Sequence, residues 1–127
     1  MRTRRMGAML LAFLTIAACA APLKEIDYYD VDTQALLKIR SMRVIDDASR
    51  AQGDYRVLGQ VQGFYCNPRP PYAATPEATA IDQVKLRAAI EGADHIGTPA
   101  CVSRKNRDIR YNCLSTVICT AEALVAD

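Results

Sequence analysis

The stretch TPEATAIDQVKLRAAIEG, residues 75–92, decides the fold because it carries the signals for both ends of a helix. Thr75 can accept a hydrogen bond from a free N–H of the first turn, and Pro76 suits the first helical position. Glu77 places negative charge at the positive end of the helix dipole. Gly92 is typical of the residue just past a helix end. We therefore predict a helix from Thr75 to about Glu91.

One side of this helix is apolar and the other is charged. The predicted buried side consists of Ile81, Val84 and Ala88, with Leu86 and Ile90 as weaker candidates. The predicted solvated side consists of Asp82, Lys85, Arg87 and Glu91.

Four other segments predict β-strands: residues 41–45, 55–62, 94–103 and 111–124. Residues 55–62 alternate, which places Tyr55, Val57, Gly59 and Val61 on one face; Gly59 suggests a bulge or close packing. Pro99 interrupts the third strand and indicates an edge or a bulge. These elements predict an α+β fold, a small single domain with a short sheet of about four strands and one main helix packed on it.

The connecting segments carry turn signals. Residues 46–53 predict a turn or a single helical turn closed by Gly53, and residues 66–71 a rigid loop with three prolines. Residues 104–108 predict a charged hairpin tip, which we favour over a contact with lipid head groups or an acidic partner. Residues 31–39 fit either a short helix or an extended arm. The nearby Tyr28 and Tyr29 could dock a partner, but we favour packing on the domain.

The first 18 residues have the anatomy of a bacterial signal peptide. Arg2, Arg4 and Arg5 precede an uncharged apolar run over residues 6–18, which is shorter than the roughly 20 residues of a membrane span. Small residues lead into Cys19, so we expect this cysteine to be lipidated after cleavage; ordinary cleavage near Ala18 also fits. Ala20 in place of an aspartate favours the outer membrane.

Composition bounds the remainder of the chain. The full chain has 16 Lys and Arg against 14 Asp and Glu, and removal of the three leader arginines leaves 13 against 14. The excess of basic over acidic residues thus comes from the leader. The remainder of the chain therefore gives no indication of the basic face that nucleic-acid binding needs. We divide the chain into a signal peptide (1–18), a lipidated N-terminus and tether (19–41) and one domain (42–127).

Five cysteines occur, at positions 19, 66, 101, 113 and 119. With Cys19 lipidated, four remain, and export to an oxidising compartment predicts two disulfides. A bridge from Cys113 to Cys119 is unfavourable because six residues of strand span roughly 20 Å. Two schemes stay open: Cys101–Cys113 with Cys66–Cys119, which local hairpin geometry mildly favours, or Cys66–Cys113 with Cys101–Cys119.

The sequence offers little for catalysis or metal binding. The cysteine spacings match neither zinc sites nor thioredoxin-like motifs, and there is a single histidine. A catalytic cysteine paired with His95 is conceivable, but we favour a structural histidine at the start of a strand. We therefore expect no enzyme, no cofactor, no metal and no small-molecule substrate.

Three segments together resemble a known family. They are VLGQVQGFYC (57–66), LRAAIEGADHI (86–96), and Cys101 followed by Asn112-Cys113 and Val117-Ile118-Cys119. They resemble the RcsF family, outer-membrane lipoproteins that sense envelope stress for the Rcs phosphorelay. The resemblance covers about residues 42–124.

The resemblance implies interlaced disulfides, Cys66–Cys113 and Cys101–Cys119. It also implies signalling by protein–protein contact, with outer-membrane β-barrel proteins and an inner-membrane Rcs inhibitor as partners. Enterobacterial family members have a long proline-rich tether, whereas only about 22 residues lie between Cys19 and the domain here, with an extended reach of at most roughly 75 Å. The alternatives are a small-ligand or metal-binding envelope lipoprotein and a structural envelope lipoprotein.

A Cys19→Ser variant tests the lipid anchor. Without the thiol there is no acylation site, so we expect this variant to lose the acyl mass and to leave the membrane fraction. Intact-mass spectrometry and membrane fractionation measure both properties. A variant that still fractionates with the membrane would place the anchor elsewhere in the chain.

Overall fold

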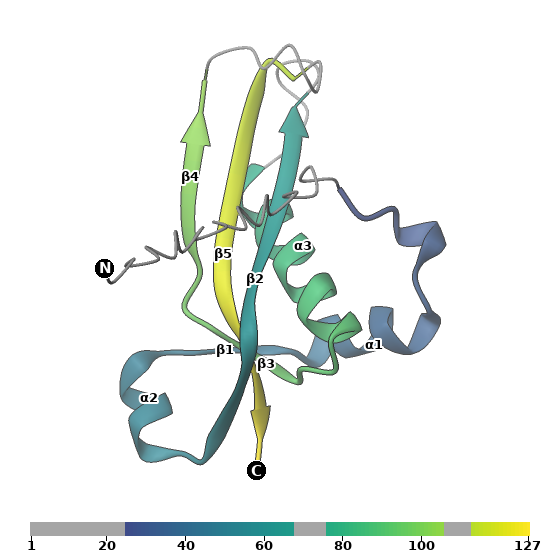
Figure 1. The fold of residues 1–127 in the computed structure, drawn as a ribbon. Helices are drawn as coiled ribbons and strands as arrows, with labels where there is room; N and C mark the ends of the chain where they lie inside the picture. Colours follow the sequence, from purple (N-terminus) through teal and green to yellow (C-terminus); the bar gives the residue numbers. More distant parts are fainter. Residues whose placement is uncertain (1–24, 68–75, 106–112) are drawn as a thin grey trace, which may run out of the picture.

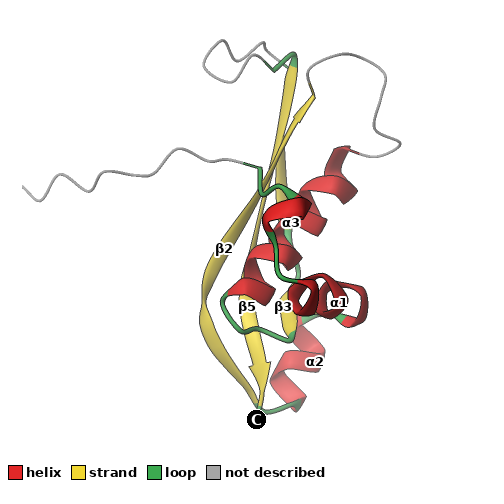
Figure 2. Cartoon of the chain, turned by 90° about the vertical axis from the view of Figure 1, so that its right-hand side faces the viewer, coloured by secondary structure: helices red, strands yellow, loops and turns green. Residues whose placement is uncertain are grey.

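The structure is a computed structural model of the 127-residue chain and describes residues 25–67, 76–105 and 113–127. It has the predicted α+β architecture, in which helices pack on one side of a mixed sheet (Figures 1 and 2). The helical elements are η1 (Tyr28–Asp30), α1 (Thr33–Ser41), α2 (Asp47–Gln52) and α3 (Pro76–Ile90). The strands are β1 (Arg43–Ile45), β2 (Tyr55–Asn67), β3 (His95–Gly97), β4 (Ala100–Arg104) and β5 (Ser115–Ala126).

The sheet is organised around β5. Strand β2 pairs antiparallel along one side of β5, and β3 and β4 pair antiparallel along its other side. Strand β1 pairs in parallel with β3, which gives the order β1-β3-β5-β2 with β4 beside β5. Because β5 has neighbours on both sides, it is the strand that the core surrounds, and Cys119, Ala123 and Leu124 are fully buried.

The predicted strand 94–103 is two strands, so the sheet has five strands and not about four. Four residue steps separate Ile96 from Ala100, while only three separate their partners Ala123 and Thr120 on β5. The extra residue lies at Thr98 and Pro99, which confirms the bulge that Pro99 predicted.

A second bulge lies in β2 between Val57 and Gly59, which confirms the bulge that Gly59 suggested. It corrects the predicted face, because the inserted residue reverses the alternation: Val57 is opposite Leu124 and is 42% exposed, whereas Val61 is opposite Ala121 and is 2% exposed. Strand β2 also continues to Asn67, beyond the predicted end at Gln62. The pairing with β5 carries Cys66 and Asn67, predicted as loop residues, into the sheet.

Helix α3 begins and ends close to its predicted bounds. Pro76 is its first residue, while the predicted cap Thr75 lies outside the described residues. At the other end the Ala93 N–H donates to the Ala88 carbonyl and the Gly92 N–H to the Ala89 carbonyl, at 2.9 and 3.0 Å. This is the Schellman arrangement, and Gly92 adopts the positive φ of 92° that it needs.

The predicted sides of α3 are largely confirmed. Val84, Leu86 and Ala88 are fully buried, and Ile81 is partly buried. Ile90 is 55% exposed, so its predicted burial was wrong; it is the last residue of α3 and borders an open groove between the helix and the N-terminal segment. On the predicted solvated side, Asp82 and Glu91 are exposed, whereas Lys85 and Arg87 are partly buried.

The contact between α3 and β2 is a close backbone approach at Gly63. A Cβ atom added to Gly63 would lie 2.1 Å from the Ala80 carbonyl oxygen and 2.5 Å from the Val84 amide nitrogen. Both are backbone atoms of a packed helix and cannot move aside cheaply. Glycine at this position therefore sets how near the helix lies to the sheet.

The segment before residue 42 is folded onto α3. The Ile26 N–H donates to Gln83 Oε1 at 2.8 Å, and Gln83 Nε2 donates back to the Ile26 carbonyl at 3.2 Å. Helix α1 then packs against α3, which selects the helix over the extended arm for this segment. From Ile26 onward, the segment assigned to the tether thus lies on the domain.

We predict that Gly63→Ala lowers the free energy of unfolding by about 2 kcal/mol, because the added methyl group overpacks a backbone contact. Gly97→Ala is the matched control: a Cβ there lies 3.7 Å from its nearest neighbour, and we expect a change within about 0.5 kcal/mol. Urea unfolding of the oxidised proteins followed by circular dichroism measures both. Equal effects of the two substitutions would refute the close-approach interpretation.

Candidate functional site

Two disulfides bind three strands together at one end of the sheet. Cys66 of β2 is bonded to Cys113, and Cys101 of β4 is bonded to Cys119 of β5. The bridges are interlaced along the chain, so the pairing implied by the resemblance to RcsF is confirmed. Cys113 and Cys119 are fully buried, while Cys66 and Cys101 are partly exposed.

The locally favoured pairing of Cys101 with Cys113 was wrong because the hairpin register differs from the expected one. A loop at residues 104–110 would place Cys101 opposite Cys113. Instead β4 continues to Arg104, which is opposite Thr116, and Cys101 is opposite Cys119. Cys113 precedes β5 and bonds across to β2, on the other side of the central strand.

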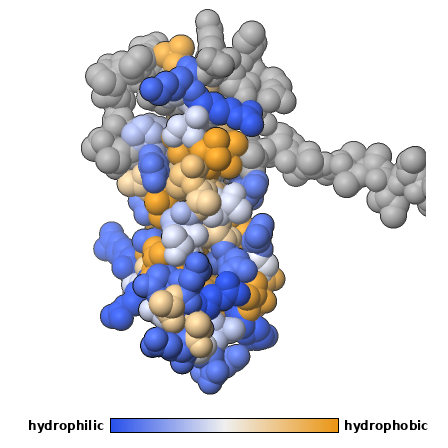
Figure 3. Space-filling model, turned by 90° about the vertical axis from the view of Figure 1, so that its left-hand side faces the viewer, coloured by the Kyte–Doolittle hydropathy of each residue, from blue (hydrophilic) through white to orange (hydrophobic). Residues whose placement is uncertain are grey.

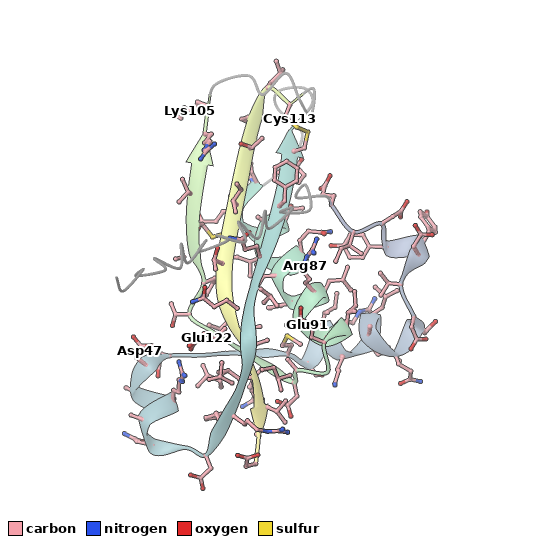
Figure 4. All side chains as sticks on the ribbon, viewed as in Figure 1. Asp47, Arg87, Glu91, Lys105, Cys113 and Glu122 are labelled. Atoms are coloured by element: carbon pink, nitrogen blue, oxygen red, sulfur yellow. A yellow bond between two sulfur atoms is a disulfide. The ribbon has the colours of Figure 1, made fainter. Side chains whose placement is uncertain are left out.

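The Cys101–Cys119 bridge also orients β4. Cys119 belongs to the core beneath α3, and its Sγ lies 4.0 Å from the Glu77 carbonyl oxygen at the start of that helix. Side chains alternate between the faces of a strand, so Val102 and Arg104 point away from α3. Val102 is 61% exposed, and Arg104 and Lys105 follow it at the exposed end of the strand (Figure 4 labels Lys105).

The outer edge of β4 forms a surface of its own. It lies on the side of the molecule that faces the viewer in Figure 3. It combines hydrophobic and strongly hydrophilic side chains, and its exposed residues are Ala100, Val102, Ser103, Arg104 and Lys105. Within the described residues β4 pairs only with β5. We call this surface, residues 100–105, the β4 edge.

A groove lies between the N-terminal segment and α3, at a distance from the disulfides. Its volume is about 630 Å³, and it is lined by apolar residues such as Ile26, Val31 and Ala35 and by polar residues such as Asp30 and Lys38. Near it, burial raises the pKa of Glu25. Burial likewise raises the pKa of Tyr28, against a smaller lowering by its hydrogen bond with Gln83. The groove could take a small molecule with an apolar body.

Tyr28 and Tyr29, which we expected to pack on the domain, differ in the structure. Tyr28 is 42% exposed and contacts the Gln83 side chain, in line with the packing we favoured. Tyr29 is 97% exposed and does not pack on the domain, so the prediction for this residue was wrong. Helix η1 turns its ring outward.

His95 lies at the start of β3, as predicted. Its Nδ1 is 2.6 Å from Asp94 Oδ1, and its ring meets the Tyr55 ring edge to face with centroids 5.5 Å apart. Burial raises the pKa of Asp94, but hydrogen bonds with His95 and with the Ala126 N–H outweigh it and hold the pKa below its usual value. All four cysteines of the described segments are in disulfides, so none of them offers His95 a thiol.

The other polar contact of note is an ion pair between Arg50 of α2 and Glu122 of β5, which fixes α2 beside the sheet. In the described part of the chain, no group of three or more His, Cys, Asp or Glu residues could hold a metal ion. None of the described helices is long and apolar enough to cross a membrane. Cys19 lies outside the described residues, as do positions 106–108 of the predicted charged loop.

In comparison with known proteins, no protein-family model matches the chain, and no curated protein is significantly similar to it.

The sequence identified the four bridge cysteines from their even number and from the leader that predicts export. It missed the β4 edge and the docking of Ile26. The one available signal for the edge was Pro99, which predicted an edge or a bulge.

We predict that both disulfides stabilise the domain and that their contributions follow the lengths of the loops they close. The bridges span 47 and 18 residues in sequence, for which chain entropy gives about 4 and about 3 kcal/mol. The double variant Cys66→Ala/Cys113→Ala should therefore lose more unfolding free energy than Cys101→Ala/Cys119→Ala. Urea unfolding measures both, and the reverse order would contradict this prediction.

Proposed function

We propose that this protein is an outer-membrane lipoprotein similar to RcsF, which senses envelope stress and signals to the Rcs phosphorelay by protein–protein contact. The observation that carries the proposal is the interlaced pair of disulfides on an α+β domain. That pairing was the one the resemblance implied and local geometry disfavoured. The leader ending at Cys19 supports the lipid anchor.

The docking of Ile26 on α3 shortens the proposed tether. Seven residue steps connect Cys19 to Ile26, so the extended chain reaches about 25 Å and not the roughly 75 Å expected for a tether to Ser41. A lipidated Cys19 would hold the domain close to the bilayer. Outer-membrane β-barrel proteins are then partners within reach, and an inner-membrane inhibitor must bring its own periplasmic part to the domain.

The proposal assigns no chemical step to the domain. The bridges stiffen the end of the sheet that presents the β4 edge, which suits a surface recognised in one fixed shape. His95 serves the structure, since it is hydrogen-bonded to its neighbour Asp94 and meets the Tyr55 ring edge to face. Partner recognition by a rigid surface fits these contacts better than turnover does.

The groove beside α1 favours a second candidate function, the binding of a small ligand by an envelope lipoprotein. About 630 Å³ is within the usual range for small-molecule sites. A carrier of this kind would not be needed for a phosphorelay response. The experiment below therefore separates the two functions.

Deletion of the gene should abolish induction of an Rcs phosphorelay reporter after lipopolysaccharide damage, because the proposed sensor is lost. Reintroduction of the wild-type gene, or of Gly97→Ala as a control for a tolerated substitution, should restore induction. The Cys19→Ser variant should fail to restore normal signalling. An unchanged reporter response in the deletion strain would overturn the sensor function and leave the ligand-binding one.

A further inference from the structure

The β4 edge has backbone groups that point outward and that pair with no other described residue. Cys101 and Cys119 face each other across the β4–β5 pair with their Cα atoms 4.0 Å apart. Such a short distance marks the narrow type of antiparallel pair, whose residues do not exchange hydrogen bonds with each other. The N–H and C=O groups of Cys101, and by alternation those of Ser103, therefore point away from β5.

The remaining backbone groups of the strand do not contribute to this edge. Ala100, Val102 and Arg104 direct theirs toward β5. On the same side as Cys101, Pro99 has no N–H to donate, so it bounds the open edge at its start. The free stretch thus runs from Cys101 to Ser103 and ends at the basic pair.

The side chains of the β4 edge indicate which residues of an added strand would fit beside it. Val102, at the centre, is 61% exposed and apolar. Arg104 and Lys105 form no ion pair with any described residue. Strand β4 itself carries no acidic residue. Natural edge strands are protected by charged residues and proline; here Pro99 and the basic pair flank the strand, while its centre is the exposed Val102.

We propose that the β4 edge binds an extended segment of a partner protein by β-strand addition, with an apolar residue of that segment beside Val102 and a carboxylate beside Arg104. Main-chain hydrogen bonds to Cys101 and Ser103 supply the attachment, and the side chains beside Val102 and Arg104 supply the selectivity. This inference rests on the proposed function only where it treats the contact as a signalling contact. The strand addition itself requires neither lipidation nor the phosphorelay.

Charge favours a partner over a second copy of the chain. Two β4 edges brought together would present Arg104 and Lys105 twice and no carboxylate from either strand. An acidic segment instead offsets both charges. Self-association is therefore an outcome that the experiment must be able to reveal.

Two synthetic peptides test the proposal on the purified oxidised chain in detergent micelles. The first, Thr-Glu-Thr-Val-Thr-Glu-Thr, presents a valine flanked by carboxylates in either strand direction; the second has lysine in place of both glutamates. In an amide NMR titration, the acidic peptide should shift the Cys101 and Ser103 amides and slow their exchange. The Val102 and Arg104 amides should respond less, and the lysine peptide should bind about fivefold more weakly.

Matched variants separate the backbone from the charge contribution. Ser103→Pro removes the outward N–H and should weaken the acidic peptide about tenfold, while Ser103→Ala keeps the N–H and should not. If Ser103→Pro fails to fold, the double variant Arg104→Glu/Lys105→Glu decides, since it should prefer the lysine peptide.

Any one of the following results would overturn the proposal: equal binding of both peptides, shifts confined to another surface, no shift at millimolar peptide, or dimerisation of the chain through β4. None of these results depends on the reporter. If the peptides fail to bind but reporter induction still requires the gene, the β4 edge is rejected as a binding site and the sensor function is kept. If the acidic peptide binds specifically but the deletion strain shows an unchanged reporter response, the binding site is kept and the sensor function is rejected.

Discussion

The structure depends on the close approach of α3 to β2 at Gly63. Because no Cβ lies between them, the helix backbone at Ala80 and Val84 comes within direct reach of the strand. That position brings the start of α3 over Cys119 and exposes the other side of the helix to the N-terminal segment. Gln83, only 3% exposed, then has its side-chain amide satisfied by both backbone groups of Ile26. A helix placed further out would lose these contacts together.

The two disulfides complete this arrangement at the end where strands have least cover. They bond β2, β4 and the chain around β5 into one unit, so β4 is held firmly although it has a neighbour on one side only within the described residues. A short edge strand would otherwise be prone to fraying. In an oxidising compartment the bridges persist, which allows a small domain with few aromatic residues to present a rigid surface. The docked N-terminal segment and the β4 edge thus belong to one body, so the proposed membrane side and the proposed partner side are fixed relative to each other.

Much of the fold could be predicted from local chemistry, and the rest depended on contacts distant in sequence. The bounds of α3 follow from Pro76 and Gly92, and the bulge between β3 and β4 follows from Pro99. Gly59 suggested a bulge or close packing, but the face of Val57 could not be predicted because the place of the extra residue is visible only in the pairing with β5. The pairing of Cys101 depended on where the hairpin turns, which the charged residues after Arg104 left open. The docking of Ile26 involves a glutamine 57 positions away, and neither residue has a local signal for it.

The most direct test of this account is a peptide map of the non-reduced protein purified from membranes. Proteolysis without reduction, followed by mass spectrometry, reports the cysteine connectivity and the state of Cys19 in one sample. The account predicts Cys66 linked to Cys113, Cys101 linked to Cys119, and an acylated Cys19 at the mature N-terminus. Free thiols, a link from Cys101 to Cys113, or an unmodified Cys19 would contradict it.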